Sequence, residues 1–352
     1  MNSIFDKLPS TAFWRPSVAE AGPFGLSGVV QTKFTIKRET KVATAGSCFA
    51  QHVGRSLRRA GINVLDVEPA PPGLDVKAAN SFGFGLFSAR YGNIYTTGQL
   101  RQLLEDVRDN NVREECVWNR DGRFFDGIRP GVEPFGSESE VEVLAIRRFH
   151  LSRLRELFTE TELFIFTLGL TECWKDLQTG TIFPVAPGVI CEPSSNQNVV
   201  FHNHNFSEVS NDLEVIKDVL CQFNSAVQII LTVSPVPLTA TCSDRHVLVA
   251  STASKSILRA AVDGFVACHP KVDYVPSYEI ITNPAVRGQF YATNLRDIDR
   301  SGVDLVMSLF LGAHGLDELA GDLRASEVFS IDTVEEIESV ICEEALAEAF
   351  LK

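Results

Sequence analysis

The fold is decided by one stretch near the start of the chain, Lys41-Val42-Ala43-Thr44-Ala45-Gly46-Ser47-Cys48-Phe49-Ala50-Gln51-His52-Val53-Gly54. A short run of strand-forming residues ends at Gly46, and an amphipathic helix pattern begins directly after Ser47. A serine at such a turn lies at the carboxyl edge of a sheet, in front of a helix N-terminus. The free N–H groups and the partial positive charge of that terminus suit a developing oxyanion. This is the placement that a nucleophilic serine requires.

Strands and helices are predicted to alternate along the rest of the chain. Strands are expected at 41–46, 62–67, 163–168, 227–233 and 272–275, and helices at 49–60, 98–108, 138–159, 207–222, 250–267 and 300–311. A hairpin is expected at 116–132, with Asp121-Gly122 as its turn, and a minor strand pair at 181–191. This order predicts a three-layer α/β/α sandwich around a central parallel sheet. In such folds ligands bind outside the carboxyl ends of the strands.

The chain divides into three parts on the same evidence. Residues 1–38 are rich in proline and aromatic residues, and they predict an irregular arm packed on the domain. Residues 39–314 form the predicted α/β domain with its insertions. Residues 315–352 form a helical extension, in which 333–351 is an acidic amphipathic helix. That helix could serve as a contact between copies of the chain in a homo-oligomer.

Composition narrows the function classes. A net charge of −13 over 352 residues argues against non-specific binding to nucleic acid or to an anionic membrane surface. We expect no membrane span, because no stretch approaches the roughly 20 apolar residues of a spanning helix. The eight cysteines form no Cys-x-x-Cys pair, which favours reduced thiols in the cytoplasm over disulfides or a zinc site. Nucleotide-binding glycine motifs are also missing, and no cofactor is expected.

Five segments resemble one known family. Residues 46–50 spell Gly-Ser-Cys-Phe-Ala, the motif of the bacterial GSCFA domain family, which looks like a divergent branch of the SGNH (GDSL-type) hydrolases. Segments 167–174, 234–238, 244–248 and 275–280 resemble further signatures of that family. The resemblance covers roughly residues 35–312. It implies the same three-layer sandwich and a serine esterase or acyltransferase site.

The candidate catalytic residues follow the ends of the predicted strands, which converge on one rim of a parallel sheet. Ser47 is the candidate nucleophile. From its residue type alone it could instead be an ordinary helix N-cap, but its match to the SGNH serine favours the nucleophile. His246 follows the strand at 227–233 and matches the histidine of the family's fourth segment, so it is the candidate base. Glu172 or Glu279 could orient its ring.

Other residues of the same rim are candidates for oxyanion and substrate binding. Thr171 stands where SGNH enzymes have an oxyanion-hole asparagine, and the backbone N–H groups of Ser47 and Cys48 could add to it. The pair Gly92-Asn93 is a candidate for the second SGNH block. Cys48 is also an alternative nucleophile, because a thiol at a helix N-terminus ionises readily. The remaining candidates for substrate contact are Trp174, Ser234 and Tyr278.

One segment departs from the SGNH pattern. Residues 292–302 correspond to the block that carries the catalytic histidine in SGNH enzymes, yet they contain none, and Asp297 stands near its place. Either His246 replaces that histidine or the hydrolase machinery is altered. The tract around His202 and His204 resembles a metal site only weakly, so no metal is expected.

Two functions remain open from the sequence. The first is an acyl-ester hydrolase or O-acyltransferase that passes an acyl group to Ser47 and then to water or to a sugar hydroxyl. The resemblance suggests a polysaccharide or another glycan as the substrate. The second is a non-catalytic protein that binds a glycan or a protein partner at the same rim.

Overall fold

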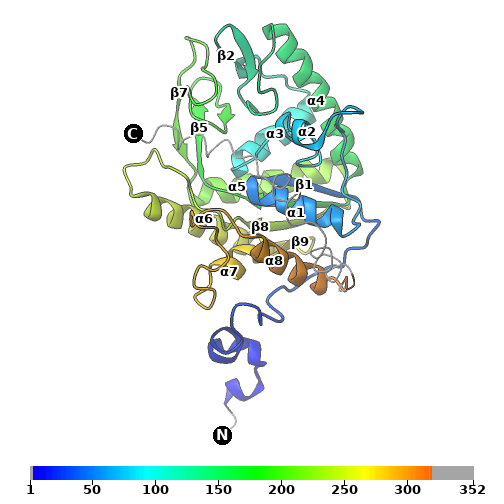
Figure 1. Cartoon of the computed structure of the whole chain (residues 1–352), viewed down its shortest axis with the longest axis vertical. Coiled ribbons are helices and arrows are strands. Elements are labelled where there is room, and N and C mark those ends of the chain that lie inside the picture. Colours follow the sequence, from blue (N-terminus) through cyan, green and yellow to red (C-terminus); the bar gives the residue numbers. More distant parts are fainter. Residues whose placement is uncertain (1–2, 317, 319–352) are drawn as a thin grey trace.

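A parallel four-stranded sheet lies at the centre of the molecule (Figure 1), for which a computed structural model describes residues 3–316 and 318. Its strands are β1 (Val42–Gly46), β4 (Leu163–Leu168), β8 (Gln228–Val233) and β9 (Val272–Tyr274), in the order β1-β4-β8-β9. The register pairs Gly46 with Thr167 and Thr167 with Thr232. The carboxyl ends of these strands therefore meet at one rim, as the sequence predicts.

Helices cover both faces of this sheet. One face packs against α3 (Thr97–Asp109), α4 (Glu140–Glu160), α5 (Phe206–Phe223) and α6 (Val247–Cys268). The other face packs against α1 (Cys48–Arg59), α7 (Ser277–Thr282) and α8 (Arg300–Ala313). Alternate residues of each strand supply the two cores, as the pleat requires: Phe164 and Phe166 face one layer, and Ile165 faces the other. The three-layer α/β/α sandwich is confirmed, and the helices predicted before residue 315 lie within three residues of the observed bounds.

Two small antiparallel sheets lie outside the sandwich. The predicted hairpin is present as β2 (Val117–Arg120) and β3 (Arg123–Asp126), and its turn residues Asp121 and Gly122 have φ values of 50° and 75°. The second sheet has the order β6-β5-β7 and consists of β5 (Glu172–Asp176), β6 (Ile182–Phe183) and β7 (Val199–Asn203). The strand pair expected within 181–191 is therefore wrong, since β6 pairs with β5 instead. The short helix α2 (Val76–Ser81) lies in the first insertion.

The strand predicted at 62–67 is reduced to a single parallel bridge between Val42 and Val64. Beyond that bridge another segment takes over the outer edge of β1. The backbone N–H of Thr44 donates to the Ser88 hydroxyl at 3.0 Å, and the Tyr91 hydroxyl donates to the Thr44 carbonyl. These bonds occupy the groups that a strand at 62–67 would need, so the ladder stops after one bridge.

The N-terminal arm differs from its prediction. Its short helical turns at Ile4–Lys7, Ser10–Ala12 and Arg15–Ala19 bury no residue, and Figure 1 shows them projecting away from the sandwich. Packing on the domain begins only near Leu26, which joins the core beneath α1 and α8. The apolar residues of the outer arm are therefore exposed, and Trp14 is 65% accessible.

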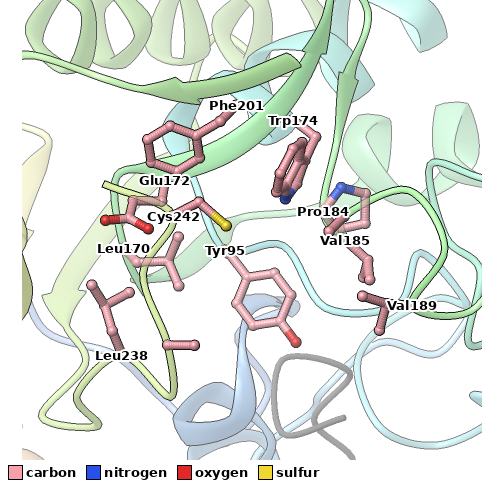
Figure 2. A pocket seen from close by; sticks show the side chains of 12 residues that line it. Tyr95, Leu170, Glu172, Trp174, Pro184, Val185, Val189, Phe201, Leu238 and Cys242 are labelled. Carbon is pink, nitrogen blue, oxygen red and sulfur yellow. The ribbon is translucent and has the colours of Figure 1, made fainter. Parts of the chain in front are cut away.

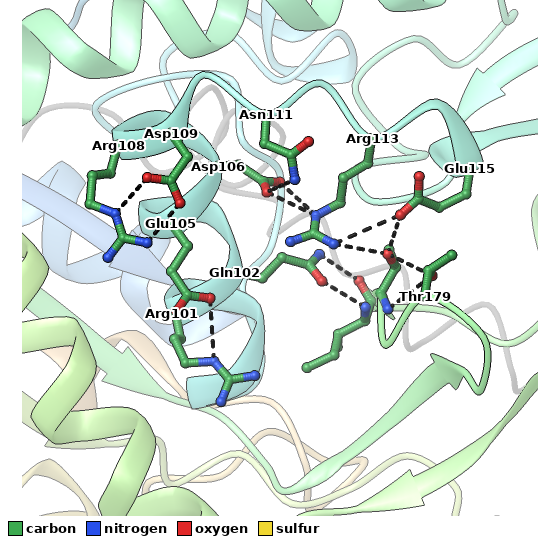
Figure 3. A network of polar contacts seen from close by, with 12 residues as sticks. Arg101, Gln102, Glu105, Asp106, Arg108, Asp109, Asn111, Arg113, Glu115 and Thr179 are labelled. Carbon is green, nitrogen blue, oxygen red and sulfur yellow. Dashed lines mark hydrogen bonds and ion pairs between the residues drawn. The ribbon is translucent and has the colours of Figure 1, made fainter.

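Buried charges fasten the β2–β3 hairpin to the helices beside it. The fully buried carboxylate of Asp106 on α3 binds Arg113 at 2.8 Å (Figure 3). It also binds Arg147 of α4 at 2.9 Å. Arg147 also reaches Asp126, at the end of β3, at 3.2 Å. Each of these buried charges thus has a partner of opposite sign, as burial requires.

No helix within residues 3–316 is both long enough and apolar enough to cross a membrane. The helix expected at 333–351, and the contact between copies proposed for it, lie outside the described residues. Within the described part the cysteines are free thiols.

Candidate functional site

The turn between β1 and α1 depends on Gly46. This residue has a φ of +144°, and a Cβ atom added to it would lie 2.7 Å from the carbonyl oxygen of Thr167. The same atom would lie 2.8 Å from Cβ of Ala50 on α1. No other residue type fits between the neighbouring strand and the helix. The glycine therefore allows the chain to pass directly from the strand end into α1 at Ser47.

Ser47 occupies the N-cap position of α1 without acting as a side-chain cap. Its hydroxyl accepts no hydrogen bond from the first turn of the helix, whereas Thr96 and Asn205 cap α3 and α5 through their side chains. Ser47 is only 5% exposed. The side-chain cap that the sequence analysis left open for Ser47 is therefore not formed.

Gly169, directly after β4, forms the surface against which the Ser47 hydroxyl lies. A Cβ atom on Gly169 would be 2.9 Å from Oγ of Ser47 and 3.1 Å from the carbonyl oxygen of Tyr95. The backbone N–H groups of Gly169 and Leu170 both donate to that carbonyl at 3.0 Å. The Tyr95 segment therefore lies across the ends of β1 and β4. Only a residue without a side chain fits at position 169.

Asn93 lies beside the same turn, in the position that the sequence assigned to the second block. The backbone N–H of Ile94 donates to the carbonyl of Gly46 at 2.8 Å, which fixes the segment that begins at Gly92 against the end of β1. The side chain of Gln51 on α1 donates to Oδ1 of Asn93 at 3.1 Å, and both side chains are buried. This bond orients the carboxamide of Asn93, because it assigns the oxygen to Gln51 and the NH₂ group to the opposite direction.

Helix α6 supplies two residues that the sequence analysis missed. Nζ of Lys255, which is 3% exposed, donates to the carbonyl of Gly169 at 2.5 Å. Oγ of Ser254 accepts from the backbone N–H of Thr171 at 3.0 Å. These contacts hold the turn after β4 on α6. A signal was present, since polar residues at 251, 254 and 255 share the helical face of Leu258 that points to the core.

Thr171 and Glu172 differ in what surrounds them. The Thr171 hydroxyl is buried and has no hydrogen-bond partner among the described residues, so a donor for a bound oxygen remains there. The carboxylate of Glu172 accepts a hydrogen bond from the Thr241 hydroxyl at 2.7 Å. Burial raises the pKa of Glu172 above its ordinary value. Both residues therefore lie at the carboxyl end of β4, as expected, but with different chemistry.

His246 lies at the exposed N-terminus of α6. Its Nδ1 accepts a hydrogen bond from the backbone N–H of Leu248 at 3.2 Å. Across the part of the chain that is described, no hydrogen bond joins His246 to Ser47, Glu172 or Glu279. The predicted pairing of base and nucleophile is not formed directly in this structure.

Glu279 has other partners. It lies in the first turn of α7, where it binds Arg259 of α6 at 2.5 Å and accepts from the Tyr274 hydroxyl at 2.7 Å. Tyr278 beside it is half-buried, and burial raises the pKa of its hydroxyl. Ser234 is buried at the end of β8, where its hydroxyl accepts from the backbone N–H of Val236 at 3.2 Å. The expected orienting role of Glu279 is thus replaced by a contact between α6 and α7.

No cluster of three or more histidine, cysteine, aspartate or glutamate side chains that could hold a metal ion occurs in residues 3–316. The ring of His204 is buried, and its Nδ1 lies 3.0 Å from the Thr171 carbonyl. His202 pairs with Glu208 at 3.0 Å.

An apolar pocket opens beside the turn that follows β4, and Figure 2 shows its walls. It contains about 610 Å³ of empty space, part of it open to solvent. The lining residues come from five segments of the chain: Tyr95, Leu170, Glu172, Trp174, Pro184, Val185, Ala186, Val189, Phe201, Leu238, Ala240 and Cys242. Trp174, expected as a substrate contact, is one of them.

Comparison with known proteins gives one match. A family model described as the GSCFA family matches residues 41–310, a range that runs from β1 into α8. No curated protein matches the chain.

Proposed function

The chain belongs to the GSCFA family, and from that premise we propose that it is an SGNH-type serine hydrolase or O-acyltransferase that works through an acyl-Ser47 intermediate. The observation that carries the proposal is the state of the Ser47 hydroxyl. It stands at a strand end before a helix, it does not cap that helix, and it lies against a glycine that has no room for a side chain. A merely structural serine at this position would be expected to bind the N–H groups of α1.

The proposed reaction transfers an acyl group in two steps. Oγ of Ser47 attacks the ester carbonyl carbon while its proton passes to the base, and the carbonyl oxygen becomes an oxyanion. Collapse of this intermediate breaks the bond to the alkoxide, which takes the proton from the base and leaves as an alcohol. Water or a sugar hydroxyl then attacks the acyl-Ser47 ester and gives its own proton to the base. Collapse of this second intermediate breaks the bond between the acyl carbon and Oγ, and the base returns the proton to Oγ of Ser47. The serine is regenerated, and an acid or a new ester is released.

The oxyanion donors in this proposal are the carboxamide NH₂ of Asn93, the hydroxyl of Thr171 and the first N–H groups of α1 at Cys48. Two observations support the side-chain donors. Gln51 fixes the carboxamide of Asn93 through its oxygen, and the Thr171 hydroxyl is buried without a partner among the described residues. The N–H of Gly169 is not in this set, because it donates to Tyr95.

His246 remains the proposed base. It belongs to the connection between β8 and α6, which also forms one wall of the apolar pocket through Leu238, Ala240 and Cys242. Its Nδ1 accepts the N–H of Leu248, which places the proton of the neutral ring on Nε2. In this proposal Nδ1 takes the proton of Ser47, after movement of this exposed connection releases the bond to Leu248. The free thiols of the described residues also support a reducing, cytoplasmic location.

Labelling with a fluorophosphonate tests the function directly. We expect one covalent adduct per chain, on the peptide that contains Ser47, and no adduct on Ser47→Ala. Ester hydrolysis by that variant should fall by roughly 10³–10⁶. Activity within tenfold of the parent would remove Ser47 from the mechanism.

The second candidate is a non-catalytic protein that binds a glycan or a protein partner at this rim. One observation favours it: no imidazole is hydrogen-bonded to Ser47 in the described part of the chain. A folded protein that neither reacts with the fluorophosphonate nor hydrolyses esters would support this candidate over the enzyme.

A further inference from the structure

The apolar pocket is joined to the Ser47 turn through the backbone of two of its own lining residues. The carbonyl of Tyr95 accepts the N–H groups of both Gly169 and Leu170, and Tyr95 and Leu170 also line the pocket. Gly169, which precedes Leu170, is the residue against which the Ser47 hydroxyl lies. A substrate whose ester carbonyl is at Ser47 can therefore extend one of its two ends toward this pocket.

The walls of the pocket are suited to an apolar ligand. Aliphatic side chains contributed by Leu170, Val185 and Leu238 face aromatic rings, and Figure 2 shows Trp174 and Phe201 across the space from Tyr95. The rings of Trp174 and Phe201 meet edge to face, with their centroids 5.9 Å apart. Such walls bind by removing apolar surface from water and offer few directional contacts.

A sugar ring fits these walls poorly. Among the described residues that line the pocket, Glu172 is the only charged one, and its Oε1 already accepts the Thr241 hydroxyl. A monosaccharide brings several hydroxyl groups, and each one buried without a partner weakens binding by roughly tenfold or more. A phosphate or carboxylate would in addition lie beside the Glu172 carboxylate. The pocket therefore disfavours both a glycan and an anionic ligand.

We propose that this pocket binds the alkyl chain of the acyl group, so that the enzyme selects esters by acyl-chain length. The inference rests on the proposed function, because it assigns the acyl side of the ester to the pocket and leaves the alcohol side, sugar or other, to the open rim. Each methylene that enters such a pocket raises affinity about fourfold until the space is filled.

Binding is measured by calorimetry on Ser47→Ala, so that no turnover is needed. The probes are the neutral alcohols 1-butanol, 1-hexanol and 1-octanol, with methyl glucoside as the sugar probe. We expect affinity to rise about fourfold per methylene over part of the series, and no binding of methyl glucoside.

Ala240→Trp and Ala186→Trp place an indole in the pocket and should abolish the dependence on chain length. Ala260→Trp, at an exposed position of α6 outside the lining, should leave it unchanged.

Val185→Thr provides a variant that keeps the shape of the wall while adding a hydroxyl, in case the tryptophan variants fail to fold. It should lower the affinity for 1-hexanol severalfold. Three results would each overturn the proposal. The first is an affinity for alcohols that does not depend on chain length, and the second is alcohol binding that survives all three pocket variants. The third is binding of methyl glucoside that these variants remove.

The outcome is independent of the test of Ser47. If the fluorophosphonate leaves Ser47 unlabelled while the alcohols still bind in the pocket, the alkyl site stands and the enzymatic function fails. If Ser47 is labelled but the alcohols do not bind, the enzymatic function stands and the alkyl site fails. When both hold, hydrolysis of p-nitrophenyl esters by the parent should follow the chain-length order of the alcohols.

Discussion

The hydroxyl oxygen of Ser47 lies 2.9 Å from the point that a Cβ atom would occupy on Gly169. This contact closes one side of the hydroxyl with a backbone that is held in place, because Gly169 donates to Tyr95 and accepts from Lys255. The glycine thus sets the direction in which Ser47 can react.

Gly169→Ala should therefore slow the labelling of Ser47. The added methyl group forces the hydroxyl to rotate or the turn to shift, and a misplacement of about 1 Å costs on the order of 100-fold in rate. The matched control is Gly264→Ala on α6, where a Cβ atom meets nothing within 4 Å. It should leave labelling unchanged and stabilise the helix by about 1 kcal/mol. Equal labelling rates for Gly169→Ala and the parent would show that the contact has no role.

Ser47→Ala should leave the free energy of unfolding unchanged or slightly raised. The hydroxyl caps no helix, so its removal loses no capping bond. Asn205→Ala is the contrasting variant, since Asn205 accepts the N–H of Glu208 at 3.1 Å and caps α5. It should lose about 0.5–2 kcal/mol in urea unfolding. A comparable loss for Ser47→Ala would return Ser47 to a structural role.

His246→Asn should reduce ester hydrolysis about as much as Ser47→Ala does, because a nucleophile and its base act as one unit. Asparagine still accepts the N–H of Leu248, so α6 keeps its cap and only the proton acceptor is lost. The measurement is kcat for a p-nitrophenyl ester, with circular dichroism as the folding control. A loss below tenfold would assign proton transfer to another group. Lys255, which binds the Gly169 carbonyl beside Ser47, is the next residue to replace.

Acid should destabilise the fold through His150. Its ring is fully buried, Nδ1 lies 2.7 Å from Glu68, and Nε2 has no partner among the described residues. Burial, reinforced by the charge of Arg129, lowers the pKa of His150 to about 4. The unfolded chain has an ordinary histidine pKa of about 6.5 and takes up the proton first, so stability is complete above pH 6.5 and falls as the pH drops toward 4.

The loss over this range should approach about 3 kcal/mol for His150 alone. Urea unfolding of the parent and of His150→Gln between pH 7 and 4.5 isolates its contribution, because other histidines titrate in both proteins. The difference between the two curves should shrink as the pH falls. Parallel curves would mean that the pKa of His150 is the same in the folded and the unfolded protein.

The sandwich could be predicted because its elements carry local signals. The strand at 163–168 is a continuous apolar run that is buried on both faces, and α1 begins where the sequence places it. The segment 62–67 is also rich in strand-forming residues, but it forms only one bridge, because Ser88 and Tyr91 bind the edge of β1 from a distant part of the chain. Such competition between segments leaves no trace in a local pattern.

The residues of the candidate site could be predicted only where a local sequence pattern marks them. Ser47 is marked by its own turn, whereas Lys255 reaches Gly169 only through the packing of α6 on the sheet. Glu279 illustrates the opposite error. Its position after a strand end suggested the catalytic rim, but the direction of its side chain is set by Arg259 on α6. Chain position gives the edge of the sheet on which a residue lies, and packing decides which way it points.

The closure of the β1 edge also bears on aggregation. An open edge strand presents alternating N–H and carbonyl groups to which a strand of another molecule can add. Here the N–H of Thr44 is taken by Ser88, its carbonyl by Tyr91, and the carbonyl of Gly46 by Ile94. A neighbouring chain therefore finds no template beside β1, and the strand that carries the serine turn is guarded against intermolecular sheet extension.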